Sequence, residues 1–191
     1  MDFKKNLAYQ IGTLFGLGLL PGGGTWASLV FLLPAIFIED PLNFLTFFVF
    51  ITLFFAPAIY KSSRPFFKSK DPKEFVLDEV LGMCLALLLI CVFFVPYRST
   101  TISDIISKEM MNILFAATFI LFRIFDILKI GPVGWVEDPT TAPSWWQKLD
   151  TNDNAYMRVI GDDIFAGFLS SFIVIILTVV YMINNLIYLW I

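Results

Sequence analysis

The chain has 191 residues, of which 58% are hydrophobic and only 15% are charged, and its mean hydropathy is +0.80. A water-soluble domain of this length needs far more charge to cover its surface, so the composition excludes an ordinary soluble protein. The net charge of −3 comes from residues between the apolar runs, and nothing in it indicates a nucleic-acid partner.

The N-terminal segment predicts a helix over residues 7–19 that lies in, or dips into, a membrane interface. Its apolar run is interrupted by glycines and lacks a small-residue cleavage site, so it is not a cleavable signal peptide. Asn6, Gln10 and Thr13 recur at helical spacing and share one face of this helix. A re-entrant hairpin over residues 7–38 is the alternative.

Five later runs predict helices that cross the membrane. A helix rises about 1.5 Å per residue, so roughly 20 apolar residues span a hydrocarbon core about 30 Å thick. Four runs approach this length, and a fifth is shorter and marginal. The expected membrane helices are residues 26–38 (the marginal one), 41–60, 80–95, 111–128 and 164–183. The sequence therefore predicts an all-α polytopic membrane protein, a single domain over residues 1–191, with about five membrane helices.

Positive residues in short loops predict which ends of the helices face the cytoplasm. The segment Lys61–Lys73 holds five lysines and arginines, whereas the turn Glu39–Asp40 holds none. This pattern places the N-terminus, residues 61–77 and residues 130–161 in the cytoplasm. The other loops and the C-terminus then lie outside.

The first motif is GLGLLPGGGTWAS, residues 16–28. Pro21 and three consecutive glycines end any preceding helix, and Thr25 or Ser28 is placed to cap the helix that follows. A glycine-rich turn leading into a helix N-terminus presents backbone N–H groups that favour an anion. A plain flexible turn is the alternative, and no Gly-Lys-Ser/Thr follows to make a nucleotide P-loop.

Two pairs of adjacent acids lead directly into apolar runs. Asp78 and Glu79 lie in VLDEVLGM, and Asp162 and Asp163 lie in IGDDIFAG. One interpretation is that they only complement the dipoles of the helices that follow. Two adjacent acids exceed what this needs, which favours a functional role.

A further motif, LFRIFDILK, carries three ionisable residues within and just after an apolar run. Arg123, Asp126 and Lys129 are spaced three residues apart and so share roughly one helix face. Ionisable groups at this depth are costly and usually functional. An ion pair whose ends reach the cytoplasmic interface is the alternative.

These motifs form a single predicted site because all of them emerge at the cytoplasmic boundary. Clustered carboxylates repel one another unless a cation neutralises them. The chain has no histidine, and its two cysteines fall inside an apolar run, so a hard divalent ion such as Mg²⁺ is the natural partner. A metal, phosphate contacts and a position at headgroup depth together predict hydrolysis of a phosphorylated lipid by a metal-activated water.

Two other functions fit the same residues. A cation or proton transporter or channel could line its path with the acids, although such a path should place ionisable groups at both mouths. A purely structural role, in which the acids terminate helices, predicts that single amide substitutions are tolerated, each losing about 0.3–1 kcal/mol.

The motifs, in this order, resemble the phosphatidylglycerophosphatase A family over about residues 10–175. The resemblance implies a Mg²⁺-dependent enzyme of the bacterial cytoplasmic membrane that converts phosphatidylglycerophosphate to phosphatidylglycerol and phosphate at the cytoplasmic face. By matching position, it also implies catalytic acids, of which all except the first would hold the metal, and substrate-binding residues. The acids are Asp78 (a ligand or the general base), Glu79, Asp126, Asp162 and Asp163, and the substrate-binding residues are Thr25, Ser28, Arg123 and Lys129.

The sequence departs from the family pattern after the third motif. Ile130 stands where the family usually has proline, and NAYMRVIGDD replaces a glycine-rich lead into the aspartate pair. We interpret residues 140–153 as an inserted polar loop whose Trp145 and Trp146 rest at the headgroup level.

Overall fold

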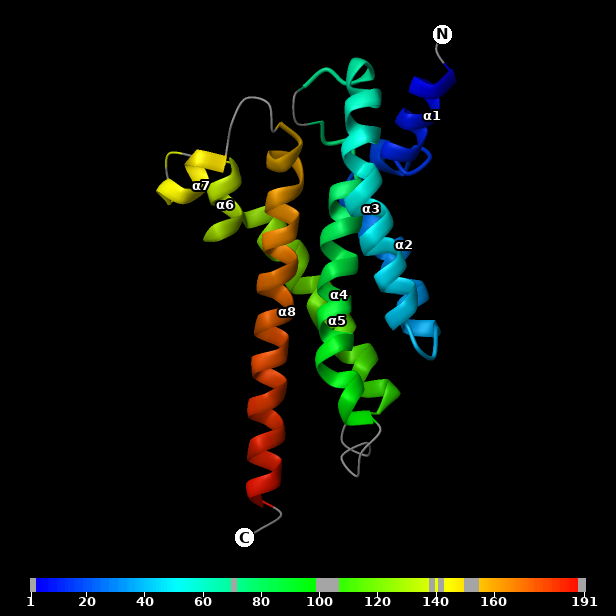
Figure 1. The fold of residues 1–191 in the computed structure, drawn as a ribbon. Coiled ribbons are helices and arrows are strands. Elements are labelled where there is room, and N and C mark those ends of the chain that lie inside the picture. Colours follow the sequence, from blue (N-terminus) through cyan, green and yellow to red (C-terminus); the bar gives the residue numbers. More distant parts are fainter. Residues whose placement is uncertain are drawn as a thin grey trace.

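The computed structural model of the chain consists of helices and their connections in the residues that it describes, which are 3–69, 72–98, 107–137, 140, 143–149 and 155–188 (Figure 1). Four helices are long and apolar enough to cross a membrane, and a fifth apolar helix is shorter. The long helices are α3 (Leu42–Ser63), α4 (Leu77–Arg98), α5 (Lys108–Leu128) and α8 (Ala155–Tyr188), and the short one is α2 (Gly23–Phe37). The predicted all-α, multi-pass architecture is confirmed.

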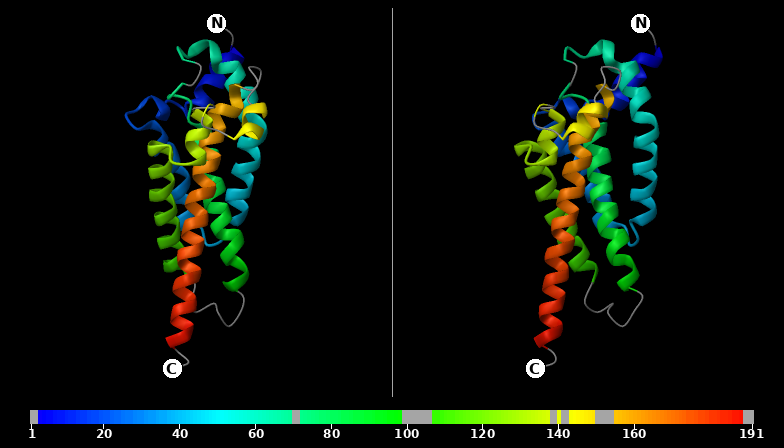
Figure 2. Two further views of the ribbon diagram at one scale, coloured as in Figure 1. Left: turned by 90° about the vertical axis from the view of Figure 1, so that its left-hand side faces the viewer. Right: turned by 60° about the vertical axis from the view of Figure 1, so that its left-hand side comes forward.

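The long helices alternate in direction, so their connections gather at two ends (Figures 1 and 2). The N-terminus, the α3–α4 connection, α6 (Pro132–Glu137) and α7 (Ser144–Leu149) lie at one end, which we call the N-terminal end of the bundle. The C-terminus lies at the opposite end. This arrangement matches the alternation that the charge pattern predicts.

The N-terminal helix α1 spans Phe3–Gly12, in place of the predicted residues 7–19. It ends because Leu14, Phe15 and Gly16 adopt left-handed backbone angles, with φ of 48°, 55° and 93°, and reverse the chain. A short 3₁₀ turn follows, η1 (Leu17–Leu19). From there α2 runs toward the opposite end of the bundle, so residues 7–38 do not form a re-entrant hairpin (Figure 1).

Aromatic side chains hold α1 against the end of α3. The ring of Tyr9 lies 5.3 Å from that of Phe66 and 5.4 Å from that of Phe67, measured between centroids. Phe66 belongs to η2 (Arg64–Phe66), the single turn that follows α3. Tilted ring pairs at this separation are favourable. Helix α1 is therefore packed on the bundle at its N-terminal end.

Helix α4 is the centre of the bundle and contacts α2, α3, α5 and α8. Within its membrane-spanning window 67% of the residues are buried inside the protein, against 17% for α3. Fully buried side chains repeat along α4, among them Val80, Met83, Leu87 and Ile90. The acids at the start of α4 are consequently surrounded by other helices.

Two predictions for the segment before the last membrane helix differ from the structure. Helix α8 begins at Ala155, nine residues before the predicted start at 164, because it continues past the apolar run to pack against α6. Helix α7 occupies part of residues 140–153, which the sequence predicts as a loop. Trp145 on α7 is 54% exposed, and residues 150–154 and the side chain of Trp146 lie outside the described residues.

Candidate active site

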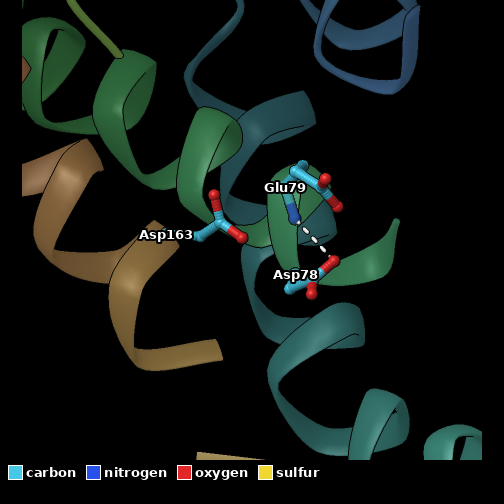
Figure 3. A group of neighbouring side chains, drawn as sticks. All are labelled: Asp78, Glu79 and Asp163. Atoms are coloured by element: carbon cyan, nitrogen blue, oxygen red, sulfur yellow. Dashed lines mark hydrogen bonds between the residues drawn. The ribbon is translucent and has the colours of Figure 1, made fainter. Parts of the chain in front are cut away.

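Three carboxylates from two helices converge at the N-terminal end of the bundle. Asp78 and Glu79 lie in the first turn of α4, and Asp163 points toward them from α8 (Figure 3). One carboxylate oxygen of each residue lies within 4.8 Å of the other two. Asp78 is 6% exposed and Asp163 is 3% exposed. We call these three residues the acidic triad.

Two glycines allow α8 to approach α4 at the triad. A Cβ atom on Gly82 would lie 2.6 Å from the carbonyl oxygen of Asp163 and 2.9 Å from its Cβ. A Cβ atom on Gly167 would lie 2.6 Å from the carbonyl oxygen of Gly82. Side chains do not tolerate such distances, so only glycine fits at either position. The crossing of α4 and α8 is therefore what brings Asp163 to the other two acids.

The glycine-rich motif packs against the side chain of Glu79. A Cβ atom on Gly24 would lie 2.2 Å from Oε1 of Glu79 and 2.9 Å from its carboxylate carbon. Without a side chain there, α2 packs directly on the carboxylate of Glu79. The backbone at Gly18 makes a similar approach, since a Cβ atom there would lie 2.2 Å from the carbonyl oxygen of Glu74, just before α4. The motif thus fits α2 closely against the start of α4.

Neither Thr25 nor Ser28 caps α2, in contrast to the prediction. The capping position is Gly22, whose left-handed backbone (φ 70°, ψ 35°) suits glycine, whereas serine and threonine caps need an extended backbone. Both residues lie inside the helix. The buried hydroxyl of Ser28 donates to the carbonyl oxygen of Gly24 at 2.8 Å, so it faces the helix backbone. Thr25 is half-buried.

The predicted cations form a second group at the end of α5. Nη1 of Arg123 lies 2.9 Å from Oδ2 of Asp126, and Nζ of Lys129 lies 3.2 Å from Oδ1 of the same residue. Nζ of Lys129 also contacts Oδ2 of Asp162 on α8. Lys129 therefore joins a carboxylate of α5 to a carboxylate of α8. We call Arg123, Asp126, Lys129 and Asp162 the ion-pair group.

The surroundings of Lys129 keep its side chain charged. Burial lowers the pKa of its ammonium group, but the carboxylates of Asp162, Asp126 and Asp163 outweigh this effect and raise the pKa above that of an ordinary lysine. Lys129 follows directly after α5, and its side chain is 28% exposed. It is therefore a permanent cation at neutral pH.

Several buried polar atoms of the site have no hydrogen-bond partner among the described residues. Among them are Oε2 of Glu79, Oδ1 of Asp163 and Nε of Arg123. An unsatisfied buried polar atom is costly, so native proteins nearly always provide it with a partner. The two carboxylate oxygens fit a hard divalent cation such as Mg²⁺, and the guanidinium nitrogen fits an anion.

The interpretation that the acids only terminate helices fails for the aspartate pair. Helix α8 begins at Ala155, so Asp162 and Asp163 are its eighth and ninth residues. At about 1.5 Å per residue they lie some 10–12 Å inside the helix, whereas the helix dipole acts within the first turn. Asp78 does perform a terminal role in part, since its Oδ1 accepts from the backbone N–H of Glu79 at 3.0 Å.

The sequence predicted which ionisable residues gather at one end of the bundle, but not how they divide into groups. The five predicted acids and two predicted cations all lie at the N-terminal end of the bundle, in the triad and the ion-pair group. Gly82 and Gly167 are the positions at which α4 and α8 pack closely. Sequence reasoning missed the contact between Gly24 and Glu79, although the run of three glycines was a signal that the backbone must approach another group closely.

These features define a multi-pass helical membrane protein with a buried acidic site at one end of its bundle. The chain belongs to the phosphatidylglycerophosphatase A family, whose family model matches residues 10–178. It is accordingly an enzyme, a phosphoric monoester hydrolase that acts on a phospholipid. No curated protein and no solved structure gives a significant match to the chain. Membership of this family decides against the transporter or channel alternative.

Proposed function

We propose that the chain removes the terminal phosphate of phosphatidylglycerophosphate in a Mg²⁺-dependent reaction at the cytoplasmic face of a bacterial cytoplasmic membrane. The observation that carries the Mg²⁺ requirement is the acidic triad, with its buried, unpartnered carboxylate oxygens. Three carboxylates with oxygens within 4.8 Å of one another repel strongly unless a cation lies between them. Asp78, Glu79 and Asp163 would hold this ion.

Mg²⁺, when bound, supplies Lewis-acid polarisation of the phosphoryl group and lowers the pKa of water. The residues of the chain provide the rest. Arg123 binds the phosphate, since its buried Nε lacks a partner among the described residues and its Nη1 is oriented by Asp126. Asp78 is either a ligand of the ion or the base that accepts the proton of the attacking water. The surrounding helices exclude bulk water, which strengthens each of these interactions.

The proposed orientation is supported by the charges at the N-terminal end of the bundle. Lys4, Lys5, Lys61, Lys68 and Lys73 are all exposed there, around α1 and the α3–α4 connection. Short connections rich in lysine and arginine stay on the cytoplasmic side. Asp78 and Glu79 of the triad lie in the first turn of α4, directly after this connection, so the triad would face the cytoplasmic headgroups.

The test is phosphate release from phosphatidylglycerophosphate in detergent micelles, with Mg²⁺ and then with excess EDTA. We expect release that EDTA abolishes and that Asp163→Asn reduces by at least about a hundredfold, since removing one charged ligand disrupts the whole constellation. The matched control is Glu109→Gln, which changes an exposed acid at the opposite end, in the first turn of α5. It should leave the rate unchanged.

Two results would contradict the proposal. If release persists in EDTA, the triad does not act through a divalent ion. If Asp163→Asn retains the activity of Glu109→Gln, the triad is not part of the active site.

A further inference from the structure

The five acids of the site fall into two groups with different partners. The triad offers three carboxylates to a common point and has no cation of the chain bonded to it among the contacts of the described residues. Asp126 and Asp162, in contrast, already share the ammonium group of Lys129. Family resemblance treats Asp126 and Asp162 as metal ligands, and the geometry assigns them another role.

Charge balance separates the two groups in the same way. The ion-pair group contains two carboxylates, Asp126 and Asp162, and two basic side chains, Arg123 and Lys129, so its formal charge is −2 plus 2, which is zero. The triad has a formal charge of −3 with all its acids ionised. A divalent ion would neutralise negative charge at the triad, whereas the ion-pair group has no net charge for it to neutralise.

Lys129 has an unusual backbone conformation at the end of α5. Lys129 ends α5 with left-handed angles (φ 50°, ψ 45°), a conformation that glycine or asparagine usually adopts at this place. Helix α6 packs closely against the backbone of Lys129: a Cβ atom on Gly134 would lie only 2.5 Å from the carbonyl oxygen of Lys129. A lysine in an unfavourable backbone conformation, held by a close glycine contact, indicates that its side chain has a specific task.

We propose that Lys129 takes the place of a second metal ion, so that the enzyme binds one divalent cation per chain, at the acidic triad. The inference rests on the proposed metal-dependent function and adds the number of ions and the role of Lys129 to it. The ammonium group neutralises Asp126 and Asp162 and ties α5 to α8. Removing its charge leaves two adjacent carboxylates, which are a new site for a divalent ion.

The experiment counts Mn²⁺ bound to the purified protein in detergent, by calorimetric titration and by electron paramagnetic resonance. The variants are Lys129→Met, Lys129→Arg, Asp163→Asn and, as a matched control, Lys148→Met on α7. We expect one Mn²⁺ per chain in the wild type, in Lys129→Arg and in Lys148→Met, with the spectrum of an isolated ion. Lys129→Met should bind two, with the spectrum of a spin-coupled pair.

Each outcome decides a separate question. Two ions in the wild type, or a single ion in a folded Lys129→Met protein, would overturn the role of Lys129 and leave the metal-dependent reaction intact. No bound ion in the wild type, or an unchanged ion in Asp163→Asn, would instead refute the proposed metal site. If Lys129→Met fails to fold, which circular dichroism and thermal unfolding will show, the wild-type count decides alone.

Discussion

Replacing Gly82 with alanine should separate the two halves of the acidic triad. The new Cβ atom would lie 2.6 Å from the carbonyl oxygen of Asp163, and ordinary contact begins at 3.4 Å, so α4 and α8 must part by about 0.8 Å (3.4 minus 2.6). The nearest atoms belong to backbone, which cannot rotate away as a flexible side chain can. Overpacking of this kind costs about 1–3 kcal/mol of stability.

The effect on catalysis should exceed the effect on stability. A displacement of roughly 1 Å at a reacting group lowers the rate on the order of a hundredfold. We therefore expect Gly82→Ala to release phosphate about a hundredfold more slowly and to require more Mg²⁺ for half-maximal rate. The assay is phosphate release as a function of Mg²⁺ concentration, together with Mn²⁺ titration and thermal unfolding of the same samples.

Gly12→Ala is the matched control for this prediction. A Cβ atom on Gly12 would lie 2.9 Å from the ring of Phe75, a similar overlap that involves α1 and not the triad. It should lower thermal stability while leaving the Mg²⁺ dependence of the rate unchanged. If Gly82→Ala binds Mn²⁺ with wild-type affinity and turns over at the wild-type rate, the close approach at Gly82 does not position Asp163, and the reasoning fails.

Three further predictions follow from other contacts. Gly24→Ala should fold normally but weaken Mn²⁺ binding by about tenfold or more, because its Cβ displaces the flexible carboxylate of Glu79; unchanged affinity in a calorimetric titration would contradict this. The loss of thermal stability in Lys129→Met, measured with EDTA present, should be constant from neutral pH to about 9.5. The raised pKa of Lys129 makes its contribution to stability complete below the ordinary lysine value near 10.4, and this contribution is lost only as pH rises from there through the raised pKa. A loss that shrinks between pH 7 and 9 would argue against the raised pKa. Lys68→Cys should react with a membrane-impermeant maleimide in inverted vesicles and not in intact spheroplasts, since Lys68 is exposed at the N-terminal end while Cys84 and Cys91 are buried; the reverse labelling would place the site outside the cytoplasm.

The membrane helices were predictable because long apolar runs have few other structural solutions. The ends of the helices were less predictable. Helix α8 extends nine residues before its apolar run, through residues whose composition resembles a loop, since packing against α6 stabilises that extension. Helix α1 ends at Gly12 because the chain reverses through left-handed residues at Leu14 and Phe15, where leucine and phenylalanine give no local signal of a turn.

The residues that gather at the N-terminal end of the bundle were predictable from residue type and position, whereas their division into two groups was not. Adjacent acids at the membrane boundary indicated a cation site, but contacts between distant segments decide which acids share it. Asp163 reaches the triad only because Gly82 and Gly167 let two helices touch. Asp126 instead forms an ion pair with Lys129, whose carbonyl oxygen is in close contact with Gly134 of α6. Contacts between segments that are distant along the chain are not evident from the local sequence pattern.

The aspartate pair carries information in its order, although its two members are the same amino acid. Successive residues of a helix point about 100° apart, so neighbours on α8 face different helices. The first, Asp162, meets Lys129 at the end of α5, and the second, Asp163, meets the acids of α4. The pair thus links three helices: Asp162 forms an ion pair with Lys129 after α5, and Asp163 joins the acids of α4, where it would hold the proposed cation. Asp162→Asn should weaken the attachment of α5 to α8, whereas Asp163→Asn should abolish binding of the proposed ion. Two substitutions of the same kind at adjacent positions should therefore give different defects.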